Sequence, residues 1–271
     1  MIQIDIVENQ HTSEILNQIR SKPELEFDPI INDKLEAFNQ CIDTILANKI
    51  EAIILPIKWI PPGGSPLISI AGLLDRPRPG ISINYKPSQE PANHLIKLHK
   101  NSLIACDDYT VMAQLKNILP EFEYMLHDQS KPTDSADIQG YVFLYSNIDT
   151  DRLETFSQQF TFNPKELIPP AGEYVYAMMC QKENEPIHLK LSQLNNPEVS
   201  RVSNIERRVL KELTSRGYSG IHVYCECDTL QNYHLFVACL DEAHQLMLGR
   251  YSSGISYGME SEILDLLSPV I

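Results

Sequence analysis

The chain lacks a cluster of basic residues. It has 22 Lys and Arg against 36 Asp and Glu, which gives a formal net charge of −14 at pH 7. Proteins whose main partner is DNA, RNA or anionic lipid need clustered Lys and Arg to displace counterions. The sequence DRPR (75–78) contains an acid, and we interpret Arg207 and Arg208 as part of a solvated helix face with ion pairs to neighbouring glutamates. We therefore expect no nucleic-acid and no membrane partner.

Long hydrophobic runs are also missing. The most apolar stretches, EAIILPIKWIPP (51–62) and EYVYAMMC (173–180), are shorter than the roughly 20 residues that a membrane span needs. The first residues, MIQIDIVENQ, do not show a basic region followed by an apolar stretch. These observations predict a cytoplasmic protein.

Cysteine is sparse, so a disulfide scaffold is not expected. The six cysteines favour free thiols in a reducing compartment. Cys225 and Cys227 share one face of an expected strand with Ile221 and Val223, and His222 lies on the opposite face. This pattern indicates core residues rather than a metal pair.

Recognisable catalytic and metal-binding spacings are absent as well. The eight histidines show no HExxH or comparable spacing, so no metal is predicted. Ser252 and Ser253 have no histidine and acid near them in the order of a known hydrolase. No hydrolase site is therefore predicted.

What the sequence does contain is an alternation of strand and helix patterns. AIIL (52–55) is apolar throughout, as in the middle of a sheet, and residues 33–48 carry apolar side chains at helical spacing. KPSQEP (86–91) is typical of a linker, and 186–198 is expected to be a second crossing between domains. Asn196 and Pro197 are typical of the cap and first turn of a helix. At 271 residues the chain is long enough for more than one domain.

Six stretches, in order and at compatible spacing, resemble the porphobilinogen deaminase family, also called hydroxymethylbilane synthase. They are LANKIEAIILPIKWIPP, ISIAGLLDRPRPGISI, SLIACDDYTVMAQLKNILPEFE, NPKELIPPAGEYVYAMMCQ, LNNPEVSRVSNIERRVLKEL and GIHVYCE. The resemblance implies an α/β protein with two lobes of the periplasmic-binding-protein type, a cleft between them, and a small α+β C-terminal domain. We expect the first lobe to comprise residues 1–86, to which the chain returns at 172–192. The second lobe is expected over 87–171 and the small domain over 193–271.

The resemblance also implies a site, and most of its residues are replaced here. Gly217 stands where the family has the cysteine that carries dipyrromethane, and Trp59 stands where it has the catalytic aspartate. Lys58 and Arg76 remain at basic positions. Asp107 and Asp108 lie where the family has small hydroxyl residues, and their charge would repel a substrate's carboxylates. An acidic pair also favours a helix N-terminus electrostatically, which is a structural reason for it.

These replacements predict a degenerate relative of the family. We expect it to be related to haem biosynthesis, to hold no dipyrromethane or other cofactor, and to have lost the transferase activity. One alternative is a functional hydroxymethylbilane synthase whose site residues are misaligned. Another is a small-molecule-binding protein that reuses the interlobe cleft, now lined by Lys58, Trp59, Arg76, Asp107 and Asp108. A protein partner is left open.

Overall fold

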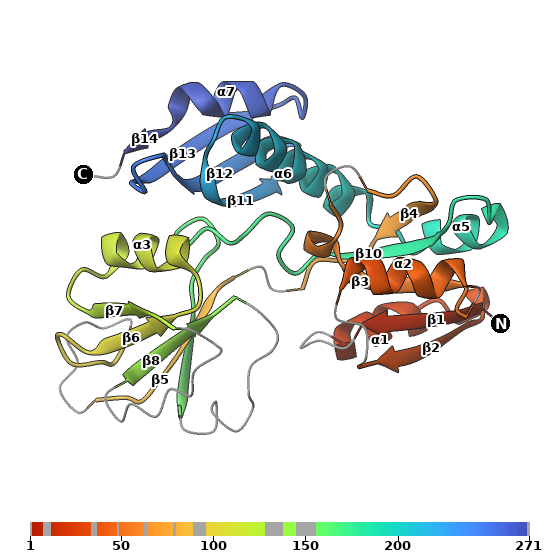
Figure 1. Cartoon of the computed structure of the whole chain (residues 1–271), viewed down its shortest axis with the longest axis horizontal. Coiled ribbons are helices and arrows are strands. Elements are labelled where there is room, and N and C mark those ends of the chain that lie inside the picture. Colours follow the sequence, from red (N-terminus) through yellow and green to blue (C-terminus); the bar gives the residue numbers. More distant parts are fainter. Residues whose placement is uncertain are drawn as a thin grey trace.

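Three β-sheets organise the part of the chain that the structure describes (Figure 1). The computed structural model describes residues 2–7, 12–33, 37–47, 49–61, 64–77, 80–88, 96–127, 138–144 and 156–269. Among these residues, no helix has the length and apolar character to cross a bilayer.

The first lobe is a mixed sheet with strand order β2-β1-β3-β10-β4. Its strands are β1 (Ile2–Val7), β2 (Phe27–Asn32), β3 (Ala52–Pro56), β4 (Ile68–Leu73) and β10 (Tyr176–Gln181). β1 pairs in parallel with β2 and β3, whereas β10 runs antiparallel between β3 and β4. The helices are α1 (Thr12–Arg20), α2 (Phe38–Leu46) and α5 (Glu185–Ser192), with single 3₁₀ turns at Pro23–Leu25 and Ile57–Trp59.

Both faces of this sheet are covered. Along β3, Ile53 and Leu55 pack in one apolar cluster with α2, while Ala52 and Ile54 pack in another with α1 and α5. A strand buried on both faces explains why its sequence is apolar at every position rather than alternating.

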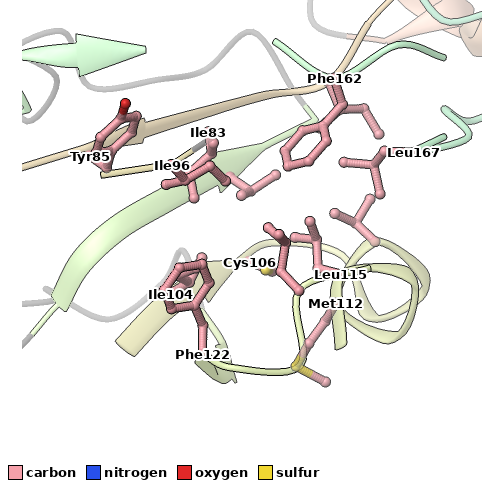
Figure 2. Packing of buried hydrophobic residues seen from close by; sticks show 14 of the residues in the cluster. Ile83, Tyr85, Ile96, Ile104, Cys106, Met112, Leu115, Phe122, Phe162 and Leu167 are labelled. Atoms are coloured by element: carbon pink, nitrogen blue, oxygen red, sulfur yellow. The ribbon is translucent and has the colours of Figure 1, made fainter. Parts of the chain in front are cut away.

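The second lobe is a sheet with strand order β7-β6-β8-β5-β9. The strands are β5 (Ser82–Tyr85), β6 (Leu103–Cys106), β7 (Glu123–Leu126), β8 (Ile138–Phe143) and β9 (Gln158–Thr161), and α3 (Tyr109–Ile118) follows β6. Figure 2 shows the core of this lobe, where Met112 and Leu115 of α3 lie with Ile83 of β5 and with Leu167, which comes after β9.

The third domain is an antiparallel sheet with two helices. It contains β11 (Ser219–Cys227), β12 (Tyr233–Leu240), β13 (Leu246–Ser253) and the short β14 (Ser268–Pro269), with α6 (Pro197–Ser215) and α7 (Met259–Leu266). Val223 and Cys225 pack under α6 and α7, whereas Tyr224 and Ala238, on the opposite face, pack toward Ala113 of α3. The predicted core position of Cys225 is confirmed, and Cys227 is partly exposed.

The structure confirms the predicted fold class, two α/β lobes with a small third domain. The chain passes from the first sheet to the second between β4 and β5, and returns between β9 and β10. The first passage comes before KPSQEP, of which residues 89–91 lie outside the described part of the chain. The segment expected to cross between domains, 186–198, contains most of α5, which packs on the first lobe through Ile187 and Leu191. The chain then passes to the third domain between α5 and the start of α6 at Pro197.

Candidate functional site

Ionisable side chains of the two lobes and of the third domain come together where these three parts are in contact. We call this group the junction: Lys58, Arg76, Asp107, Asp108, Glu173, Glu206 and His222. Lys58 follows β3, and its Nζ lies 2.9 Å from both carboxylate oxygens of Glu173. Glu173 lies on the segment between β9 and β10, which we call the returning segment. The Glu173 side chain is only 5% exposed. Burial raises the pKa of Glu173, although Lys58 and Arg76 act in the opposite direction.

Glu206 of α6 is the most fully bonded member of the junction. Arg76, just after β4, donates to its two oxygens at 2.8 and 3.2 Å. The backbone N–H groups of Gly172 and Cys225 donate at 2.8 and 2.9 Å. The Glu206 side chain is 0% exposed, so these four hydrogen bonds replace its contact with water. One carboxylate thus joins the first lobe, the returning segment and β11.

Arg76 makes further contacts. Its Nε donates to the carbonyl of Glu173 at 3.0 Å, and its guanidinium lies 5.1 Å from the ring centre of Tyr224. Nearby on α6, Arg207 donates to the carbonyl oxygens of Ile57, Ile60 and Pro61. The interpretation of this stretch of α6 as a solvated face is therefore wrong for Arg207, which binds the first lobe.

Asp108 connects the second lobe to β11. Its side chain caps α3 by accepting the N–H of Val111 at 2.8 Å, and its Oδ1 lies 3.3 Å from Nε2 of His222. The other ring nitrogen of His222 lies 2.8 Å from the carbonyl oxygen of Ile168. Burial disfavours the Asp108 carboxylate, but the hydrogen bond and charge of His222, together with the N–H groups of Val111 and Thr110, outweigh this effect, so the pKa of Asp108 is lowered.

The pKa of Asp107 is shifted in the opposite direction, upward. It follows β6, and both of its carboxylate oxygens accept the N–H of Leu144 at 3.1 Å. Burial raises its pKa to about 6, and the charges of Asp108 and Glu173 act in the same direction. A carboxyl group with this pKa exchanges its proton near neutral pH and responds strongly to any nearby cation.

The structure brings four of the five expected cleft residues together. Lys58, Arg76, Asp107 and Asp108 belong to the junction, whereas Trp59 packs partly buried against the core of the first lobe. Gly217 lies elsewhere, in a hollow of about 550 Å³ on the third domain. That hollow is lined by Arg216, Gly217, Tyr218, Asp241, Glu242, Ala243, Leu264 and Asp265.

Sequence reasoning missed Glu173, Glu206 and His222. A signal was present for Glu206, which shares the apolar face of α6 with Val202 and Val209 at spacings of four and three. A carboxylate on such a face needs a buried partner. Within the described residues, no group of three or more His, Cys, Asp or Glu could hold a metal ion.

Comparisons with known proteins give structural matches only. No family model and no curated protein matches the sequence. One similar solved structure is a periplasmic substrate-binding protein of an ABC transporter from Coxiella burnetii, with 12% identity, 74% of this chain and 94% of that chain covered, and a TM-score of 0.41. Another is a nutrient-binding protein from Burkholderia cenocepacia bound to methionine, with 11% identity, coverage of 73% and 93%, and a TM-score of 0.42. A third is a YaeC-family lipoprotein from Enterococcus faecalis, with 12% identity, coverage of 76% and 96%, and a TM-score of 0.39.

The comparisons correct expectations from the sequence. The resemblance to porphobilinogen deaminase and the expected relation to haem biosynthesis are withdrawn, because no family model and no curated protein matches and the solved structures found are described as substrate-binding proteins. The expectation of a cytoplasmic location is withdrawn as well, and the matched proteins themselves are described as periplasmic or as a lipoprotein. The junction agrees with the correction, because Lys58 and Arg76 already bind the chain's own carboxylates.

Proposed function

We propose that the protein binds a small molecule with a cationic group between its two lobes, beside Asp107. The proposal is supported by the topology, in which two α/β lobes are joined by two crossing segments. Ligands of open α/β sheets bind outside the carboxyl ends of the strands. Lys58 follows β3 and Asp107 follows β6, so both occupy such ends.

The observation that carries the charge preference is the raised pKa of Asp107, about 6. Lys58 is paired with Glu173, so its charge is already balanced within the chain. A cationic ligand group beside Asp107 would offset the burial of this carboxylate and stabilise its ionised form. An anionic ligand would instead add a further negative charge beside Asp107 and Glu173.

The first probes are amino acids and small amines. L-methionine leads the panel because one matched structure is described as bound to methionine. Binding can be followed by titration calorimetry and by the emission of Trp59, which neighbours Lys58 and is the only tryptophan. We expect affinity to fall as the pH drops below about 6, because protonation of Asp107 removes its charge.

The matched variants are Asp107→Asn and Asp43→Asn. Asp43 lies exposed on α2, outside the junction. We expect Asp107→Asn to weaken binding by at least about tenfold, the loss of roughly one charge-assisted contact, and Asp43→Asn to bind like the wild type. Equal affinity of the two variants, or no binding of any cationic probe, would refute the proposal.

A further inference from the structure

One end of the third sheet brings together an aspartate, a histidine and a serine. His234 of β12 lies directly opposite Ser252 of β13, with Nδ1 2.8 Å from the Ser252 Oγ. Its Nε2 lies 3.1 Å from Oδ2 of Asp228, just after β11. Ser252 is exposed, and the His234 and Asp228 side chains are 30% and 31% exposed. The three residues come from three neighbouring strands or their ends, so their proximity cannot be recognised from a local sequence motif.

Several hydrogen bonds stabilise the ionised form of Asp228. The N–H groups of Asn232 and Leu230 and the side-chain amide of Asn232 donate to its carboxylate. These bonds, the N–H of Asn232 first, and the contact with His234 lower the Asp228 pKa to about 2. An ionised Asp228 favours the tautomer with the proton on Nε2. The Nδ1 lone pair of His234 then faces the hydroxyl of Ser252.

Apolar side chains lie exposed in the turns at the same end of the sheet. Leu230, between β11 and β12, is 80% exposed, and Ile255 and Tyr257, after β13, are 68% and 82% exposed. The two turns approach each other, since a Cβ on Gly254 would lie 3.6 Å from Oδ1 of Asn232. Exposed apolar groups beside a polar cluster suit a ligand with an apolar portion.

We propose that Ser252 is a nucleophile that accepts acyl groups from esters with an apolar acyl chain. Its Oγ bonds to the carbonyl carbon while its proton passes to Nδ1 of His234. The bond to the alcohol oxygen then breaks, and the proton on Nδ1 goes to the departing alkoxide. Water, activated by the same nitrogen, releases the acid and restores Ser252. Asp228 acts through His234 as a positioning residue, and none of these residues belongs to the junction.

The test starts with a fluorophosphonate probe and intact-mass measurement of the full chain. Wild type should gain one phosphonyl group, and Ser252→Ala should gain none. Ser253→Ala is the matched control, because Ser253 is the next residue of β13, paired with Tyr233 rather than His234, and its hydroxyl accepts the N–H of Ile255. We expect this control to label at the wild-type rate. An unlabelled wild type, or equal labelling of Ser252→Ala, overturns the proposal.

Turnover of p-nitrophenyl acetate, butyrate and octanoate tests the roles of the other two residues. His234→Gln should lower the rate by about 100-fold, as expected for loss of a general base. Asp228→Asn should lower kcat by at least about tenfold with KM unchanged, a split that loss of turn structure alone would not produce. The longer acyl chains should show the lower KM. Rates in both variants equal to wild type would remove His234 and Asp228 from the mechanism.

Discussion

Two adjacent carboxylates at the head of α3 differ in the direction of their pKa shifts. Asp107 is partly buried beside Asp108 and Glu173, so its pKa is raised, whereas Asp108 faces His222 and its pKa is lowered. Identical side chains one residue apart therefore respond oppositely to pH, because their partners, rather than their sequence position, set the charge state.

This difference predicts opposite pH effects on stability. The folded pKa of Asp107, about 6, lies above its ordinary 3.8, so its stabilising protonation is complete below pH 3.8 and is lost as the pH rises through about 6. Between pH 4 and pH 7, Asp107→Asn should therefore gain on the order of 2 kcal/mol in unfolding free energy relative to wild type. Asp108 contributes stability above its ordinary pKa, which is lost on acidification, so Asp108→Asn should be destabilised at pH 7. Urea unfolding across this pH range measures both, and shifts of the same sign would contradict the prediction.

At the scale of elements, the contact between α3 and β11 depends on the absence of a side chain. Gly220 has a φ of +51°, and a Cβ there would lie 2.1 Å from Oγ1 of Thr110. The Thr110 hydroxyl donates to the carbonyl of Gly220 at 2.8 Å. The backbone of β11 can approach the second lobe closely only because this residue is glycine.

We therefore expect Gly220→Ala to loosen the third domain from the second lobe. Gly258→Ala is the matched control, since Gly258 also has a positive φ, +83°, but a Cβ added there would meet nothing within 4 Å. Both variants should lose about 1–2 kcal/mol for the left-handed backbone. Gly220→Ala should lose more, because Thr110 and Leu240 must move. Urea unfolding and limited proteolysis between the domains report the difference, and equal losses would contradict it.

Some elements were readable from local signals, and others were not. Asn196 and Pro197 predicted the start of α6, and Asn196 accepts the N–H groups of Glu198 and Val199 as a cap does. The helix α5 was missed because Pro186 and the polar residues at its ends resemble a linker, although Ile187 and Leu191 are spaced to bury one face. The contact of Asp228, His234 and Ser252 depends on strand register, which a local pattern does not give.

At the scale of the whole molecule, the third domain is joined to both lobes by hydrogen bonds and ion pairs. In Figure 1 it lies along one side of the two lobes, with α6 reaching toward the first. Arg207 and the Arg76–Glu206 pair bind it to the first lobe, and the His222–Asp108 pair binds it to the second. The sequence predicted the two lobes and the small domain. It could not predict this attachment, because the bonded residues are up to 150 positions apart.

Arg76→Ala tests whether this attachment makes unfolding cooperative. Removing Arg76 leaves Glu206 as a buried charge without its cationic partner, which costs about 3–5 kcal/mol. Arg216→Ala is the control, because the Arg216–Glu212 pair is exposed and contributes at most about 0.5 kcal/mol. In urea, Trp59 emission reports the first lobe and far-UV circular dichroism reports all helices. We expect the two transitions to coincide in wild type and in Arg216→Ala. In Arg76→Ala the dichroism signal should begin to fall at lower urea than the Trp59 signal, as the third domain separates first. Coincident transitions with an unchanged midpoint in Arg76→Ala would show that the buried pair does not couple the domains.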